Sequence, residues 1–165
     1  MAIEIREARP DEYAAAGGVT ADAYREFARE GDPDWHAYLE RIADVGDRAT
    51  RTTILVAVDD TRILGSATLE LDGRTEAEDG PLAPHEAHIR MLGVALDARG
   101  RGIGRLLMQT CERRAGESGR TLVTLHTTQR MRAAQGMYEA LGYERGEDRI
   151  FPDGFVLMSY SKRLV

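Results

Sequence analysis

Residues 88–108 read HIRMLGVALDARGRGIGRLLM, and this stretch decides the fold of the chain. Its first part predicts an apolar strand over Ile89–Leu96 that stops at Asp97. A loop of arginine and glycine follows at Arg99–Gly104, and a helix begins at once, with apolar residues recurring at helical spacing. A strand, a glycine loop and a helix N-terminus in this order build a pocket for an anion, because the first N–H groups of a helix have no partner within it.

The loop itself suits a negatively charged ligand. Glycines lack a Cβ atom, so the backbone of Arg99–Gly104 can come close to a ligand. Arg99, Arg101 and Arg105 concentrate positive charge in a chain whose net charge is −6. We interpret this local concentration as a site for a pyrophosphate.

Two common glycine-loop motifs are excluded. The dinucleotide motif requires G-x-G-x-x-G, whereas the glycines here fall at Gly100, Gly102 and Gly104 and no later glycine completes the pattern. The P-loop motif requires a lysine, and the only lysine is Lys162. What remains is R-x-x-G-x-G, directly after a Leu-Gly-Val segment at 92–94.

Two segments together resemble the GCN5-related N-acetyltransferase (GNAT) superfamily. The R-x-x-G-x-G pattern after the Leu-Gly-Val segment is similar to the acetyl-CoA signature of that family. Residues 133–143, AAQGMYEALGY, are similar to the family's late segment A-x-x-L-Y-E-x-L-G-F, with Met137 and Tyr143 in place of Leu and Phe. The two motifs occur in the family's order, and the resemblance, which spans nearly the whole chain, is sharpest over residues 88–143.

The bulk properties limit the classes of function. A chain of 165 residues, 42% hydrophobic and 30% charged, predicts a single soluble domain over residues 1–165. The net charge of −6 argues against a nucleic acid or an anionic membrane as a partner. No apolar run approaches the length of a membrane span, and the first residues are too charged for a signal peptide. Cys111 is the only cysteine, which excludes an intramolecular disulfide and favours a cytoplasmic location.

The periodicity predicts an α/β fold with a mixed sheet of about seven strands and helices on both faces. The expected strands are Ile3–Ile5, Thr53–Val58, Ile63–Leu71 (a hairpin turning at Asp59-Asp60), Ile89–Leu96, Thr121–His126, Tyr143–Arg149 and Phe155–Lys162. The first expected helix is Asp11–Ala28, interrupted at Gly17-Gly18, and the second begins at the capping signal Asp32-Pro33-Asp34 and runs through Asp47. The third begins at Ile103 and is stopped by Gly119, and the fourth is Arg130–Leu141, stopped by Gly142. The GNAT, or acyl-CoA N-acyltransferase, fold has the same order of elements.

The resemblance implies acetyl-CoA as the cosubstrate and no metal. The residues that it assigns to cosubstrate binding are Leu92, Gly93, Val94, Arg99, Gly100, Arg101, Gly102, Ile103, Gly104 and Arg105. By the same resemblance, the Leu92 N–H polarises the thioester carbonyl, Val94 pairs with the pantetheine like a neighbouring strand, and Gly93 lets the cosubstrate approach. A backbone donor at a strand bulge would do this without reorganisation.

Tyr138 matches the tyrosine that protonates the leaving thiolate in the family. A phenol pKa of about 10 lies close to that of a thiol, so proton transfer between them is nearly balanced. The alternative is a tyrosine that only fills the core, because Tyr138 shares a helix stripe with Ala134, Met137 and Leu141.

The general base is open at this point. Many family members have a glutamate where this chain has His88, and a neutral imidazole can take the same role, so we prefer His88. Glu86, Glu70 and a chain of waters are the alternatives. A second departure is Met131, which stands where members often have an asparagine that contacts the cosubstrate.

Other chemistry is less well supported. Arg130, Arg132 or Gln135 could replace the asparagine contact, but solvated arginines on a helix face are the simpler interpretation. His85 and His88 point to opposite faces of a strand, so a metal site is not expected. Cys111 is expected to be a packed core thiol rather than a nucleophile.

The sequence therefore predicts an N-acetyltransferase that transfers an acetyl group directly from acetyl-CoA to a primary amine, with a small molecule as the preferred acceptor. The alternatives are a protein N-terminal or lysine acetyltransferase, and a non-catalytic acyl-CoA-binding sensor. Residues 11–47 are expected to form much of the acceptor wall, with Trp35, His36 and Tyr38 as possible contacts or simply core. Folds of this kind often form a homodimer, which is therefore a possible assembly.

Overall fold

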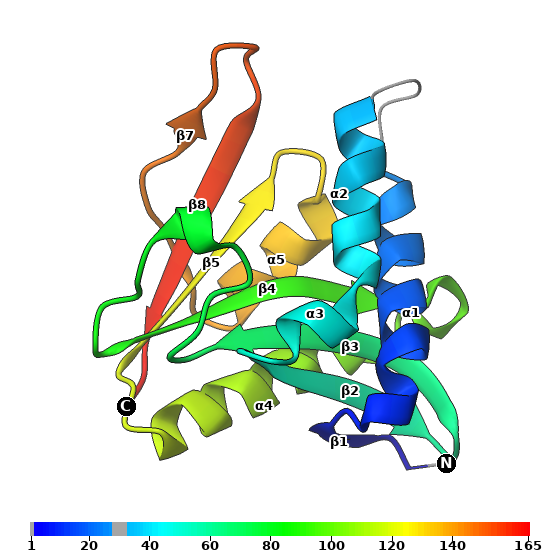
Figure 1. Cartoon of the computed structure of the whole chain (residues 1–165). Coiled ribbons are helices and arrows are strands. Elements are labelled where there is room, and N and C mark those ends of the chain that lie inside the picture. Colours follow the sequence, from blue (N-terminus) through cyan, green and yellow to red (C-terminus); the bar gives the residue numbers. More distant parts are fainter. Residues whose placement is uncertain (1, 28–32) are drawn as a thin grey trace.

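Within residues 2–27 and 33–165, which the computed structural model describes, eight strands form one mixed sheet (Figure 1). The strands are β1 (Glu4–Glu7), β2 (Thr53–Asp59), β3 (Arg62–Glu70), β4 (Glu86–Val94), β5 (Leu122–Thr128), β6 (Glu144–Arg145), β7 (Arg149–Ile150) and β8 (Val156–Arg163). Their order across the sheet is β1-β2-β3-β4-β5-β8-β6, and β7 also pairs with β8. Of the paired strands, β4 and β5 run parallel, and the other pairs run antiparallel.

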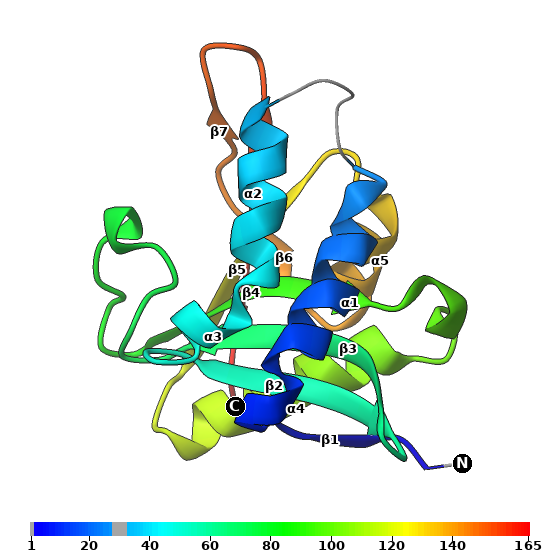
Figure 2. The ribbon, with the colours of Figure 1, turned by 45° about the vertical axis from the view of Figure 1, so that its right-hand side comes forward.

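Helices cover both faces of this sheet, as the sequence predicts (Figure 2). They are α1 (Tyr13–Arg25), α2 (Pro33–Ala43), α3 (Val45–Arg48), α4 (Ile103–Glu117) and α5 (Arg132–Ala140). Helices α1 to α3 lie on one face, and α4 and α5 lie on the other. The parallel pair β4–β5 is joined through α4, which is the connection that parallel strands require.

The first helix differs from its prediction. A 3-10 turn at Pro10–Glu12 precedes α1, and α1 then runs through Gly17 and Gly18, so the predicted interruption is wrong. Gly17 serves packing instead, because a Cβ atom there would lie 2.0 Å from the carbonyl oxygen of Ala43. The missing side chain lets α1 lie against the end of α2.

The second predicted helix is two helices, so the single helix through Asp47 is also wrong. The chain breaks at Asp44, whose carboxylate accepts a hydrogen bond from the backbone N–H of Asp47 (3.1 Å) and caps α3. The predicted end of the first helix at Ala28 and the capping residue Asp32 lie outside the described residues.

Two strand predictions need correction. The signature strand occupies Glu86–Val94 rather than Ile89–Leu96, since residues 86–89 pair with β5 and Leu96–Ala98 form a 3-10 turn. The single strand predicted over Tyr143–Arg149 is two short strands, β6 and β7. The described sheet therefore has one strand more than the sequence predicts.

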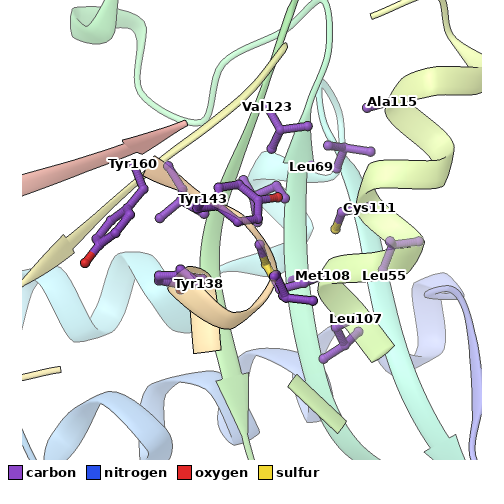
Figure 3. Close-up of a cluster of buried hydrophobic side chains, with 14 of the residues drawn as sticks. Leu55, Leu69, Leu107, Met108, Cys111, Ala115, Val123, Tyr138, Tyr143 and Tyr160 are labelled. Carbon is purple, nitrogen blue, oxygen red and sulfur yellow. The ribbon is translucent and has the colours of Figure 1, made fainter. Parts of the chain in front are cut away.

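The larger core cluster lies between the sheet and α4 (Figure 3). Leu107, Met108 and Cys111 of α4 are fully buried there, together with β-strand residues such as Leu55 and Leu69. The prediction that Cys111 is a packed core thiol is confirmed, and burial raises the pKa of this thiol to about 12. Tyr138 enters the same cluster from α5, so the core and the site described next share a wall.

Candidate active site

A cavity of about 570 Å³ opens where β4 and β5 separate. The two strands pair only over Glu86–Ile89 and Leu122–Leu125, although β4 continues to Val94 and β5 to Thr128. Their unpaired ends line the cavity from its two sides, together with the loop before α4, the end of α1 and the start of α5. An extended ligand can therefore lie between two strands that no longer bond to each other.

The β4 wall of the cavity carries a strand bulge. Ser66 faces Gly93 and Thr68 faces Arg90, so Ala67 lies opposite two residues, Met91 and Leu92. Met91 has a φ of 51°, which is unusual for a side chain of its size and marks the distortion. The bulge interrupts the regular ladder at Leu92, the position to which the resemblance assigns the carbonyl-polarising N–H.

The packing of β4 against α1 explains why residue 93 is a glycine. A Cβ atom on Gly93 would lie 3.0 Å from Cα of Thr20 and 3.3 Å from Cβ of Ala23, so it would point at α1. From the sequence, we expect this glycine to let the cosubstrate approach the backbone closely. Its backbone does line the cavity, but the missing side chain serves the contact between β4 and α1.

The arginine and glycine loop forms the mouth of the cavity at the N-terminus of α4. Gly100 and Gly102 have φ values of 83° and 75°, and Gly102 is the N-cap of α4 in the left-handed region. A residue with a Cβ atom would be strained in this backbone conformation, which explains glycine at both positions. The first N–H groups of α4 are thereby directed to a site that favours an anion.

The loop arginines do not all face the cavity. Arg99 and Arg105 line it, and Arg99 also forms an ion pair with Glu26 of the segment after α1 (2.7 Å). Arg101 is not among the described lining residues, and its guanidinium lies 3.8 Å from the carboxylate of Asp59. Ile103 and Gly104 line the cavity at the first turn of α4.

The start of α5 supplies further positive charge. Arg130 and Arg132 both line the cavity. From the sequence, a solvated helix face is the simpler interpretation of these two arginines. Met131 lines it between them, where the resemblance expects an asparagine. Gln135 is not available for the same contact, because its side-chain amide donates to the backbone carbonyl of Thr128 (2.7 Å).

Tyr138 reaches the cavity from the core side. It is 7% exposed and lines the cavity, while its ring packs against Tyr143 and Tyr160 with ring centroids 6.0 and 5.8 Å away. Burial raises the pKa of Tyr138 above its usual value, so the phenol holds its proton at neutral pH. A protonated phenol at the cavity wall is the state that the predicted role of proton donor requires, and the same ring also fills the core.

The comparisons with known proteins agree with this geometry. A family model described as the acetyltransferase (GNAT) family matches residues 17–143, which is well over half of the chain. The chain belongs to the GNAT family. It is therefore an acyltransferase, and its mixed sheet with helices on both faces is the fold of that family.

Solved GNAT structures have the same fold over nearly the full chain. A Salmonella typhimurium protein solved with acetyl-CoA is 20% identical with a TM-score of 0.72, covering 100% of this chain and 95% of its own. An N-acetyltransferase from Thermoplasma acidophilum in complex with coenzyme A is 15% identical with a TM-score of 0.72 (96% and 98% covered). A ribosomal-protein-alanine N-acetyltransferase from Brucella melitensis is 20% identical with a TM-score of 0.68 (98% and 99% covered). The search of curated protein sequences finds no match.

The candidate bases of this GNAT protein have different environments. Glu70 is fully buried, pairs with Arg74 (2.8 Å) and accepts the backbone N–H of Thr75, so its carboxylate is already engaged. Glu86 accepts from the hydroxyl of Thr124 (2.6 Å). His88 is 3% exposed and is not among the described residues that line the cavity.

Several lining residues lie outside the sequence motifs. Ala23, Tyr24 and Phe27 come from the end of α1 and the residues after it, and His126 comes from β5. No motif marks these positions, because the two family segments cover the loop at the start of α4 and residues 133–143. His126 could have been found only from the strand pairing, which places β5 beside β4.

Trp35 and Tyr38, the predicted acceptor contacts on α2, belong to an aromatic cluster. Trp35 packs against Tyr38 with ring centroids 5.5 Å apart, and Tyr38 packs against Tyr24, 6.4 Å away. Tyr24 in turn lines the cavity, whereas His36 is exposed.

In residues 2–27 and 33–165, no helix is long and apolar enough to cross a membrane.

Proposed function

We propose that this GNAT protein transfers the acetyl group of acetyl-CoA directly to a primary amine of a small molecule, through a ternary complex and without an acetyl-enzyme. The observation that supports this most is one cavity that joins the Arg99–Gly104 loop at the N-terminus of α4, the bulged end of β4, and Tyr138. These are the groups that hold an anion, polarise a carbonyl and donate a proton. A binding module without catalysis would need only the first.

The proposed reaction uses each group once. The α4 N-terminus with Arg99 and Arg105 holds the pyrophosphate of acetyl-CoA, and the Leu92 N–H bonds to the thioester oxygen as it gains charge. The acceptor ammonium loses one proton, and its nitrogen then attacks the carbonyl carbon. As the C–S bond breaks, the nitrogen releases its second proton to solvent, which leaves a neutral amide. Tyr138 gives its proton to the leaving thiolate, and solvent restores it. We further propose that residues 1–165 act as one catalytic domain in the cytoplasm.

The cosubstrate site is tested by isothermal titration with acetyl-CoA, coenzyme A and NAD. We expect acetyl-CoA and coenzyme A to bind and NAD not to bind. The double variant Arg99→Ala/Arg105→Ala should weaken acetyl-CoA binding about tenfold or more, because charge-assisted hydrogen bonds are lost. Arg113→Ala is the matched control, since Arg113 lies on the same helix with its side chain 63% exposed. Absence of binding by both coenzyme A species would refute the proposal.

The acceptor class is tested by following thiol release with three amines. Spermidine represents small molecules, an alanyl dipeptide represents a protein N-terminus, and an N-terminally blocked lysine peptide represents a protein side chain. Preference for spermidine supports the small-molecule proposal. Preference for the alanyl dipeptide would instead favour the N-terminal alternative, the activity named for the Brucella relative.

A further inference from the structure

A row of polar side chains crosses from β4 to β5 beside the cavity. Glu86 and His88 are two residues apart on β4, and Thr124 and His126 are two residues apart on β5, so each pair shares a strand face. The parallel register places His88 opposite Thr124, and the side chains of these two residues hydrogen-bond. The four side chains therefore lie on the same face of the sheet.

The hydrogen bonds of this row have a defined direction. The hydroxyl of Thr124 donates to the carboxylate of Glu86 (2.6 Å), which in its ionised form can only accept. The single hydroxyl proton is then used, so the Thr124 oxygen accepts from Nδ1 of His88 (2.7 Å). The neutral His88 ring therefore carries its proton on Nδ1.

The two histidines are adjacent but differ in access. Their ring centroids lie 5.1 Å apart with the planes at 52°. His88 is buried, whereas His126 is exposed and lines the cavity that also contains Leu92 and Tyr138. Nδ1 of His126 lies 3.2 Å from the hydroxyl of Ser159. With its proton on Nδ1, the neutral ring has the lone pair of Nε2 to accept a proton from an amine.

We infer that His126 is the general base of the proposed acetyl transfer, and that Glu86, Thr124 and His88 position it. This inference rests on the proposed function. His126 Nε2 takes one proton from the acceptor ammonium, and the freed amine lone pair forms the bond to the thioester carbon. The imidazolium then loses that proton to solvent through its exposed edge. His88, fixed as a neutral ring, packs against His126 without adding a positive charge that would oppose this protonation.

The surrounding charges favour a neutral His126 before the reaction. Partial burial lowers its pKa first, and Arg90 and Arg74 lower it further, while Asp79 and the Met158 carbonyl act in the opposite direction. A lowered pKa means that the free base predominates at neutral pH. The pKa of His88 is also lowered, mainly by burial and then by His126, Arg74 and Arg90. Glu70 and Asp79 pair with these two arginines and limit their effect.

The first test reads the histidines directly, by NMR of the protein with ¹⁵N-labelled histidine. We expect His88 to remain the Nδ1–H tautomer between pH 5 and 8, and His126 to titrate with a pKa below about 6.5. Thr124→Val should release the His88 tautomer, whereas Thr124→Ser should keep it, because only serine retains the hydroxyl. Addition of coenzyme A should shift the His126 signals and leave those of exposed His85 in place.

The second test measures acetyl-CoA turnover against pH with n-butylamine as the probe. His126→Gln should lower kcat/KM at least about 100-fold and remove the acidic limb of the profile, while the affinity for acetyl-CoA stays within about twofold. Thr124→Val should lower kcat, Thr124→Ser should restore most of it, and His85→Gln should match the parent protein. A His126→Gln variant with an unchanged rate and pH profile would overturn the inference, as would a His88 ring protonated on Nε2.

The two tests separate this inference from the proposed function. If coenzyme A fails to bind, the proposed function fails and the inference fails with it. If coenzyme A binds and the parent protein turns over n-butylamine, but His126→Gln leaves the rate unchanged, the function stands and the base lies elsewhere. If coenzyme A binds without shifting the His126 signals, His126 does not face the cosubstrate and the inference is overturned regardless of turnover.

Discussion

Tyr138 is both a core residue and a wall of the cavity, and its two parts can be separated by mutation. The ring packs against Tyr143 and Tyr160, while the hydroxyl is the proposed proton donor. Tyr138→Phe keeps the ring, so we expect the melting temperature and the acetyl-CoA affinity to stay nearly unchanged. Turnover should fall about 100-fold, because the thiolate loses its acid.

Tyr160→Phe is the matched control for that measurement, since Tyr160 lies in the same cluster but is not among the described lining residues of the cavity. It should leave turnover unchanged. Equal turnover of the Tyr138→Phe and parent proteins in a thiol-release assay would show that Tyr138 only fills the core. Absence of thiol release by both proteins would favour the sensor alternative.

The contact between α1 and β4 is an element-scale feature that depends on Gly93. A Cβ atom there would lie within 3.0–3.3 Å of Thr20 and Ala23, so α1 has to move away from the sheet. Gly93→Ala should therefore lower the free energy of unfolding by about 1–3 kcal/mol. It should also weaken acetyl-CoA binding, because the end of α1 forms part of the cavity wall.

Gly116→Ala gives the opposite expectation within the same protein. Gly116 lies near the end of α4, and a Cβ atom there would meet no heavy atom within 4 Å. Alanine should raise the free energy of unfolding by roughly 0.5–1 kcal/mol through its better helix propensity. Chemical denaturation of both variants measures the contrast, and a Gly93→Ala variant as stable as the parent would contradict the close packing.

At the scale of the whole molecule, Glu70 ties the loop between β3 and β4 to the sheet. Its buried carboxylate accepts from Arg74 (2.8 Å) and from the backbone N–H of Thr75 (2.5 Å), and it lies 3.9 Å from Arg90. Glu70→Ala should lower the free energy of unfolding by about 3 kcal/mol, because two largely buried guanidiniums and a buried N–H lose their partner.

Asp72→Ala removes a carboxylate of the same loop whose side chain is 96% exposed and pairs with Arg120. Because the Asp72 carboxylate stays in water, its pair with Arg120, whose side chain is 16% exposed, should contribute less than the Glu70 network. This variant should therefore lose at most about 1 kcal/mol in urea. A similar small effect of Glu70→Ala would mean that the buried network does not hold the loop.

Local chemistry explains which predictions succeed. Gly119 and Gly142 are predicted to stop two helices, and both adopt a positive φ directly after the ends of α4 and α5. The hairpin forms as predicted, although its turn is Asp60–Thr61, one residue later than expected, because Asp59 still pairs with Arg62. The core thiol of Cys111 follows from helical spacing. These features depend on neighbours along the chain, so the pattern of residues is sufficient to predict them.

The errors have a common cause in contacts between distant segments. The sequence predicts a start of β4 that is too late, because only the pairing with Leu122 and Thr124 makes Glu86 and His88 strand residues. It predicts a break at Gly17 because the group that requires this glycine, the carbonyl of Ala43, lies on another helix. Neither contact can be deduced from periodicity.

By itself, the sequence determined the family, the mixed sheet and the glycine loop before α4, because glycine conformation and apolar spacing act over a few residues. Tertiary structure alone decided which side chains surround the cavity. It turned Arg101 toward Asp59, brought Arg130 and Arg132 to the cavity, and buried His88 beside His126. The physical reason is that β4 and β5 pair for only four residues and then separate. Strand register decides which side chains face the resulting gap, and no local pattern encodes that register.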